Sequence, residues 1–466
     1  MRALQPVKAT PEQLALLGVQ DPAVVIYGAA GSGKTTTALI RLRALAASWL
    51  SRRTRLGLDA PVRILVLTYN KTLAGYIDNL AKEQIQGSEH LNLFVGTFAK
   101  WAVSVSGSHG IADGEDTIRA LVSGLSNDRK YRDFLTEEAV YVMERFLPQD
   151  IDDYLTVRRD GRGSTPRIDK AMRQRLIDEV VKPYQAANRA EGSLDWNDLA
   201  VAAYHATSAE KWDIVVIDEA QDFTANQLRA VVAHLSETHS LTCVLDSMQR
   251  IYHRYFTWKE VGIDAVNSTH RLAVNHRNTK QIAAFARPLV AGLTRDNELG
   301  ALPDFQNCTR EGPLPVVLRG LYSKQMAYVF DHYLPAVDLQ SESVAFLHPK
   351  GGGYFKDLRE ALEVRGYPWD ELTRTSDWPS NDNALALSTM HSAKGLEFDH
   401  VIALGLNQDL TPHGDEEDDA HLGALQRLVA MSIGRAKKSV LLGTKPGVES
   451  SVFEFLEPET YEAIDL

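Results

Sequence analysis

The sequence feature that most constrains the fold is the glycine-rich stretch GAAGSGKT at residues 28–35. The apolar run AVVIY precedes it, and the helix-forming segment TTTALIRLRALAASWL begins at its last residue. This order predicts a buried strand, a tight turn and a helix, which is the unit that opens an α/β domain with a parallel sheet. The fixed positions of the pattern G-x-x-x-x-G-K-[ST] are Gly28, Gly33, Lys34 and Thr35.

A turn of this kind binds phosphate groups. Its glycines let the backbone curl so that N–H groups face phosphate oxygens at the N-terminus of the following helix. Lys34 is predicted to reach the β- and γ-phosphates of a nucleotide, and the Thr35 hydroxyl to ligate Mg²⁺. The residues of this stretch predicted to bind the nucleotide are Gly28, Ala29, Ala30, Gly31, Ser32, Gly33, Lys34, Thr35 and Thr36.

Two neighbouring carboxylates end a second apolar run, in the segment KWDIVVIDEAQDF at residues 211–223. A buried parallel strand over this run would place Asp218 and Glu219 at its C-terminal end, where ligands of such sheets bind. Asp218 is predicted to hold the magnesium ion, and Glu219 to polarise the water that attacks the γ-phosphate. Two solvated acids at a strand end are the alternative interpretation of the same segment.

Composition narrows the class of protein without deciding its partner. The net charge of −11, from 50 Lys and Arg against 61 Asp and Glu, argues against a chain that is basic throughout. It leaves nucleic acid open, because a local channel is enough to hold a phosphate backbone. No window approaches the ~18 apolar residues that span a bilayer, and Cys243 and Cys308 support neither a disulfide framework nor a zinc cluster. We expect a cytoplasmic protein with no membrane partner.

Further segments follow one another in a specific order. They are ATPEQLALL (9–17), RILVLTYNKTLAGYI (63–77), VGTFAKWA (95–102), LDWNDL (194–199), CVLDSMQRIY (243–252), NHRNTKQI (275–282), STMHSAKGLEFDHVIAL (388–404) and RLVAMSIGRAKKSVLL (427–442). Together with DEAQDF, this series resembles the motifs of superfamily 1A helicases of the UvrD/Rep/PcrA type. The order of the segments carries the resemblance, because each segment alone is weak evidence.

The resemblance implies roles for single residues. Gln13 would read the adenine ring, and Gln249 would couple the γ-phosphate to the path of the DNA. Arg277 and Arg435 would bring positive charge to the γ-phosphate from a second domain, while Glu397 would contact the ribose or phosphate region. The predicted catalytic residues are Lys34, Glu219, Gln249, Arg277 and Arg435.

Aromatic positions depart from the family pattern. His276 stands where the family usually has a tyrosine that stacks on adenine, and an imidazole ring can also stack. After the third motif, Tyr255, Phe256 and Trp258 are candidates for stacking on nucleic-acid bases, which requires only an exposed aromatic face. A place in the hydrophobic core is the alternative for these three residues.

The motif spacing and the resemblance together predict the domain organisation. We expect an α/β fold with two RecA-like P-loop NTPase domains, each a parallel sheet flanked by helices, and a helical insertion called 1B. The predicted ranges are 1–101 for the first part of domain 1A, 102–192 for 1B, 193–272 for the second part of 1A, and 273–466 for domain 2A. The family's other insertion, 2B, is predicted to be absent or vestigial. Strand and helix signals fill most of the stretch between the fourth and fifth motifs, and only DELTRTSDWPSNDN (370–383) is left for it.

The resemblance implies an ATP- and Mg²⁺-dependent translocase or helicase that acts on single-stranded DNA, or on a 3′-tailed duplex, and moves 3′ to 5′. One alternative is a nucleic-acid-gated regulatory ATPase subunit of a larger complex, such as a prokaryotic defence system, which needs a protein partner and does not unwind duplexes by itself. A phosphotransferase acting on a small molecule is a second alternative, and the motifs near the C-terminus argue against it.

Overall fold

The structure of the chain is a computed structural model. It describes residues 9–28, 31–68, 74–75, 77–78, 90–107, 110–111, 114–157, 167–206, 210–246, 256–265, 268–272, 274–291, 308–373, 378–379, 381–408 and 420–466. Among these residues, no helix is both long and apolar enough to cross a bilayer.

The first sheet is parallel throughout, and its described strands have the order β3-β2-β4-β5-β1-β6. The strands are β1 (Ala23–Gly28), β2 (Val62–Thr68), β3 (Leu91–Thr97), β4 (Trp212–Ile217), β5 (Leu235–Asp246) and β6 (Thr269–Leu272). Strands β1, β2 and β4 are almost continuously buried and rich in valine, isoleucine and leucine, as expected of parallel strands covered on both faces. The strands predicted before GAAGSGKT and before Asp218 are therefore confirmed.

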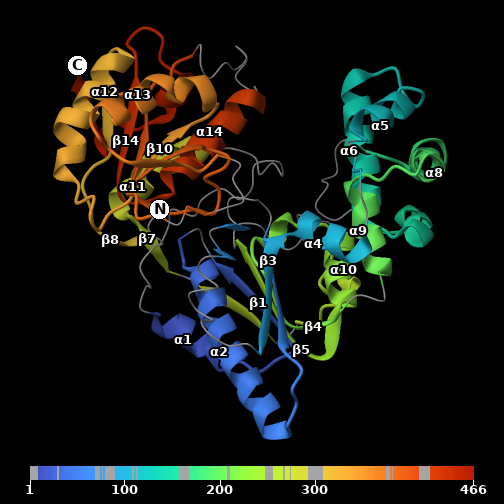
Figure 1. Ribbon diagram of the computed structural model, residues 1–466. Coiled ribbons are helices and arrows are strands. Elements are labelled where there is room, and N and C mark those ends of the chain that lie inside the picture. Colours follow the sequence, from blue (N-terminus) through green and yellow to red (C-terminus); the bar gives the residue numbers. More distant parts are fainter. Residues whose placement is uncertain are drawn as a thin grey trace.

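Helices cover both faces of the first sheet (Figure 1). They are α1 (Pro11–Leu17), α2 (Lys34–Leu56), α4 (Phe98–Ser106), α9 (Trp196–His205) and α10 (Ala225–Ala233). Apolar residues of α2 pack with one face of the sheet, and those of α4, α9 and α10 pack with the other face. Phe256 is buried in the second of these clusters and Trp258 packs against it. The stacking hypothesis is therefore wrong for Phe256, and Tyr255 lies outside the described residues.

A separate group of helices stands beside α9 and α10 (Figure 1). It consists of α5 (Glu115–Val122), α6 (Arg129–Arg145), a 3-10 segment (Pro148–Leu155), α7 (Lys170–Leu176), a π-helical turn (Ile177–Val181) and α8 (Lys182–Glu191). These helices enclose an apolar core of their own. The helical character predicted for residues 102–192 is confirmed for the described part of that range, whereas the domain boundaries stay a prediction.

One buried asparagine fastens this helical group to the first sheet. Asn226 in α10 is fully buried, and its amide nitrogen donates to the carbonyl oxygens of Met143 at 2.8 Å and Phe146 at 2.9 Å. Both carbonyls lie at the end of α6, where the last carbonyl groups of a helix have no partner within the helix. Arg145, also at this end, forms an ion pair of 2.9 Å with Glu260.

The second sheet is also parallel, with the strand order β11-β12-β10-β13-β14-β9-β15 among the described residues. Its strands are β9 (Val316–Arg319), β10 (Val344–His348), β11 (Trp369–Glu371), β12 (Leu385–Thr389), β13 (Phe398–Ala403), β14 (Ala436–Thr444) and β15 (Glu462–Asp465). A separate parallel pair precedes it, formed by β7 (Asn275–Thr279) and β8 (Cys308–Arg310). The fold class predicted from the sequence, two parallel sheets flanked by helices, is thus confirmed.

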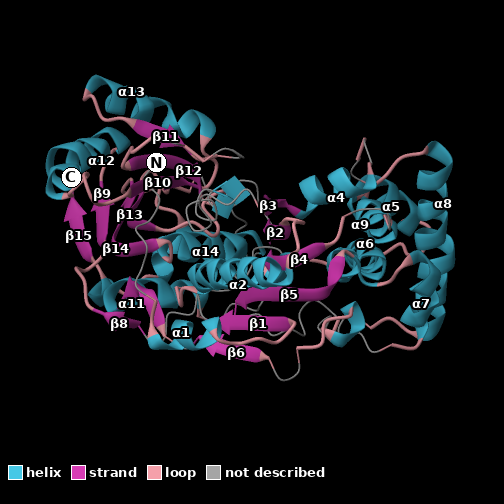
Figure 2. Ribbon diagram, turned by 60° about the horizontal axis from the view of Figure 1, so that its bottom comes forward, coloured by secondary structure: helices cyan, strands magenta, loops and turns pink. Residues whose placement is uncertain are grey.

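Helices lie on both sides of the second sheet (Figure 2). They are α11 (Lys280–Val290), α12 (Tyr322–Tyr328), α13 (Lys356–Val364) and α14 (Ala420–Ile433). Helices α12 and α13 share one apolar cluster with the sheet. Helices α11 and α14 belong to a larger cluster that continues to the α2 side of the first sheet. The two sheets therefore share one hydrophobic core on this side.

We expect Asn226→Ala to lower the free energy of unfolding by about 1–3 kcal/mol, because two buried carbonyl groups lose their donor. Denaturant unfolding followed by circular dichroism measures this change. Asn127→Ala, at an exposed asparagine before α6, is the matched control and should stay within about 0.5 kcal/mol of the wild type. Equal effects of the two substitutions would contradict the assigned role of Asn226.

Candidate functional site

The loop between β1 and α2 requires glycine at two positions. Gly31 and Gly33 have φ angles of 82° and 77°, in the left-handed region that favours glycine. A Cβ atom on Gly33 would lie 2.4 Å from the side-chain nitrogen of Gln13, and one on Gly31 would lie 2.3 Å from Oδ1 of Asn275. The loop therefore packs against both α1 and β7. Below, the first half of the chain means the part up to β6, and the second half means the part from β7 onward.

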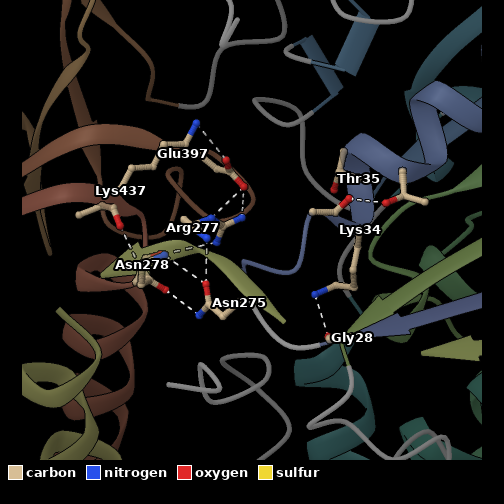
Figure 3. Close-up of polar contacts among 12 residues, drawn as sticks. Gly28, Lys34, Thr35, Asn275, Arg277, Asn278, Glu397 and Lys437 are labelled. Atoms are coloured by element: carbon tan, nitrogen blue, oxygen red, sulfur yellow. Dashed lines mark hydrogen bonds and ion pairs between the residues drawn. The ribbon is translucent and has the colours of Figure 1, made fainter. Parts of the chain in front are cut away.

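Lys34 and Thr35 begin helix α2 and turn toward different partners (Figure 3). Lys34 Nζ donates to the carbonyl oxygen of Gly28 at 2.9 Å, so the lysine spans the loop. Thr35 Oγ1 donates to Oδ2 of Asp218 at 2.9 Å. Ser32 is buried, and its hydroxyl has no hydrogen-bond partner within the described parts of the chain. A phosphate oxygen in this loop would give that hydroxyl an acceptor.

Asp218 and Glu219 follow β4 directly, and their environments differ. The backbone N–H of Asp218 donates to Leu67 at the end of the neighbouring β2 at 2.8 Å. Burial, followed by the adjacent charge of Glu219, raises the pKa of Asp218 to about 7. Glu219 has a φ angle of 52° and is the only described residue other than glycine with a positive φ. Such backbone strain is concentrated at functional sites.

Cations from both halves of the chain surround the Glu219 carboxylate. Burial alone would raise the pKa of Glu219, but three positive side chains outweigh it and lower that pKa: Lys394, Lys34 and Arg435. Gln221 also donates to Glu219 Oε2. The pKa of Asp218 is therefore raised and that of the adjacent Glu219 is lowered. Opposite pKa shifts of this kind give two carboxyl groups different chemical roles.

Arg277 and Glu397 form an ion pair on the side of the second sheet (Figure 3). Arg277 Nε donates to Glu397 Oε1 at 2.8 Å, and Lys437 Nζ lies 3.4 Å from Glu397 Oε2. Burial favours the neutral acid, but Arg277 and then Lys437 overcome this effect and lower the pKa of Glu397 to about 2. Glu397 is thus an anion held between two cations.

A further ion pair joins the two halves of the chain. Lys394, in the loop before β13, donates to Asp222 Oδ2 at 2.7 Å, and both side chains are largely buried. Neither residue was singled out from the sequence, although both lie within segments quoted above, KGLEF and DEAQDF. Each lies three positions from a predicted site residue, Lys394 before Glu397 and Asp222 after Glu219, and this closeness was the available signal.

The arrangement fits a nucleotide with a magnesium ion. Thr35 Oγ1 and Asp218 Oδ2 are adjacent oxygen atoms, and Mg²⁺ prefers oxygen ligands supplied by one or two protein groups together with phosphates and water. No cluster of three or more histidine, cysteine or acidic residues that could hold a metal occurs among the described residues. An ion between Thr35 and Asp218 would therefore take its other ligands from phosphate oxygens and water.

The remaining predicted residues are placed as follows. Gln13 is buried, and its Oε1 accepts from the Thr10 backbone at 2.9 Å while its Nε2 donates to Gly33 at 3.3 Å. Thr36 is half-buried on α2. His276 lies in β7, but its side chain is outside the described atoms. Ala29, Ala30 and Gln249 also lie outside the described residues, and the roles of all these residues stay predictions.

Comparison with known proteins places the chain among helicases. Residues 9–260 match the model of the UvrD/REP helicase N-terminal domain, and residues 358–445 match the UvrD-like helicase C-terminal domain. A probable DNA helicase of Mycoplasma pneumoniae is 23% identical over 465 residues, covering 92% of this chain and 82% of that protein.

Two other relatives match over shorter spans. A probable DNA helicase II homologue of Mycoplasma capricolum is 25% identical over 304 residues, covering 58% of this chain but 38% of the relative. The ATP-dependent DNA helicase PcrA of Staphylococcus aureus is 38% identical over 70 residues, which are 14% of this chain and 10% of the relative. The N-terminal family model alone spans more than half of the sequence, and the chain belongs to the UvrD/REP helicase family.

Proposed function

We propose that this protein is an ATP- and Mg²⁺-dependent DNA translocase or helicase that acts on single-stranded DNA and moves 3′ to 5′. One observation carries the proposal. The Thr35–Asp218 pair at the edge of the first sheet lies next to Glu219, and the charges of Lys394 and Arg435 from the second half act on that carboxylate. A movement of one half relative to the other would therefore change the charges that act on Glu219.

In the proposed reaction, the first half binds the nucleotide and prepares the water. Lys34 would exchange the Gly28 carbonyl for β- and γ-phosphate oxygens, and Thr35 and Asp218 would hold the magnesium ion. The bound ion would neutralise charge on the phosphates. Glu219, whose lowered pKa keeps it ionised at neutral pH, would orient the attacking water and accept its proton.

The second half would supply positive charge to the phosphates. Arg435 already lies close enough to Glu219 to influence its pKa. Arg277 is held by Glu397 in this structure, so its approach to a phosphate would require it to leave that carboxylate. Binding and release of the γ-phosphate would then favour different positions of the two halves, and alternate grip on a strand would produce directional movement.

The choice of single-stranded DNA as substrate is supported by the family and by the relatives named as DNA helicases. The 3′-to-5′ direction and action on a 3′-tailed duplex are further parts of this proposal, as is a cytoplasmic location, where ATP and DNA are both accessible. A protein partner is part of the regulatory alternative only.

The hydrolysis roles can be separated by two substitutions. Lys34→Ala should lower both nucleotide binding and the ATPase rate, the latter by about 100-fold or more, because a cation facing the phosphates is lost. Glu219→Gln should lower kcat by about 100-fold, the range of general base catalysis, and leave ATP affinity within about threefold. Stopped-flow phosphate release and fluorescent-nucleotide binding measure these values. Rapid hydrolysis by the Glu219→Gln protein would overturn the mechanism.

Arg435→Ala should reduce DNA-stimulated ATP turnover by about 1,000-fold, the effect of removing an arginine that stabilises phosphoryl transfer. Affinity for single-stranded DNA, measured by fluorescence anisotropy, should change by no more than about threefold, since the charge faces the nucleotide. Arg55→Ala, at an exposed arginine on α2, is the control and should keep wild-type turnover. Equal losses in turnover and DNA binding would contradict the proposed role.

The overall proposal is tested by the ATPase rate with no nucleic acid, single-stranded DNA, duplex DNA and RNA, followed by strand separation on 3′- and 5′-tailed duplexes. We expect stimulation by single-stranded DNA and a preference for the 3′ tail. Stimulation without strand separation, unless a partner is added, would favour the regulatory subunit. ATP turnover that is independent of nucleic acid would favour the small-molecule phosphotransferase.

A further inference from the structure

The turn that carries Arg435 is held at three successive carbonyl groups. It connects α14 to β14, and the backbone N–H of Phe398 donates to the Arg435 carbonyl oxygen at 3.0 Å. The carbonyl groups on either side belong to Gly434 and Ala436, and both accept from the side-chain nitrogen of Asn278, at 3.2 Å and 2.7 Å. The backbone around Arg435 is therefore fixed from β7 and from the start of β13.

Asn278 is the neighbour of Arg277 in β7 and is fully buried. A second buried amide, Asn275, orients it, because Asn275 Nδ2 donates to Asn278 Oδ1 at 3.1 Å. The Asn275 oxygen accepts from the backbone N–H groups of Arg277 at 3.0 Å and Asn278 at 3.1 Å. The two amides thus form one hydrogen-bonded unit, which also contacts the phosphate loop through Gly31.

The same turn is in reach of Arg277 itself. Arg277 Nη1 lies 3.5 Å from the Gly434 carbonyl oxygen, and its other nitrogen atoms pair with Glu397, one residue before Phe398. Arg277 and Arg435 belong to segments more than 150 residues apart in the sequence. The side chain of Asn278, beside Arg277 (Figure 3), connects their backbones.

We infer that Asn278 is a positioning residue that holds Arg277 and Arg435 at a fixed separation, so that both arginines approach the nucleotide as one body. This inference rests on the proposed function, in which both side chains serve the same phosphate group. The Asn278 amide is bonded to the carbonyl groups on both sides of Arg435, so it fixes the backbone of Arg435 relative to the neighbouring Arg277. A displacement of about 1 Å in such a group can cost about 100-fold in rate.

The chain offers a closely matched control for this residue. Asn226 is also fully buried and also donates to two backbone carbonyl groups, at 2.8 Å and 2.9 Å, but it fastens the helical group and not the arginine turn. Replacement of either asparagine by alanine or aspartate removes the same kind of donor. A purely structural role would give the same result at both positions.

The experiment compares four variants: Asn278→Ala, Asn278→Asp, Asn226→Ala and Asn226→Asp. For each, kcat and KM for ATP are measured at saturating single-stranded DNA and at a temperature below the thermal unfolding midpoint of every variant. The Asn278 variants should lose about 10- to 100-fold in kcat with KM within threefold, whereas the Asn226 variants should keep kcat within twofold. When Arg435→Ala is added to the Asn278→Ala protein, the further loss in kcat should be much smaller than the loss that Arg435→Ala causes in the wild type.

A second readout needs neither nucleotide nor turnover. Hydrogen exchange of peptides containing Phe398 should accelerate at least tenfold in the nucleotide-free Asn278 variants and stay unchanged in the Asn226 variants, because the Phe398 amide bonds to the arginine turn. Wild-type kcat or unchanged exchange in the Asn278 variants would overturn the inference. A wild-type protein without ATPase activity would refute the proposed function, while accelerated exchange would still support the anchored turn.

Discussion

A single hydrogen bond between Thr35 and Asp218 joins residues 183 positions apart in the sequence, and the candidate site is arranged around it. The bond is possible because β1 and β4 run in the same direction on either side of β5. The carboxyl ends of parallel strands meet at one edge of the sheet. The phosphate loop and the paired acids therefore reach the same edge, although the helical group is inserted between them in the chain.

Electrostatics then connects this edge to the second sheet. Three positive side chains keep Glu219 ionised, and two of them come from residues beyond 390. A carboxylate in that position without those cations would resemble its neighbour Asp218, whose pKa burial raises. The lowered pKa of Glu219 therefore depends in part on cations of the second half. Glu397 shows the same principle within the second half, since Arg277 and Lys437 hold it as an anion.

Local patterns in the sequence predicted the strands, the phosphate loop and the acids at the end of β4, because spacing and apolar runs determine these features. They did not identify Lys394, whose ion pair with Asp222 depends on how the two halves meet. Asn278 was missed for a similar reason, since its partners are backbone carbonyl groups and carry no residue identity. Phe256 was ambiguous because an aromatic residue after a strand suits either stacking or the core.

The attachment of the helical group has a consequence for how its sequence can diverge. The Asn226 amide nitrogen donates to main-chain oxygens of residues 143 and 146, so this part of the joint does not depend on which side chains stand at those two positions. The group also has a separate apolar core. The exposed side chains of these helices can therefore vary between relatives without loss of the attachment, provided that α6 still ends opposite Asn226 and the asparagine is retained.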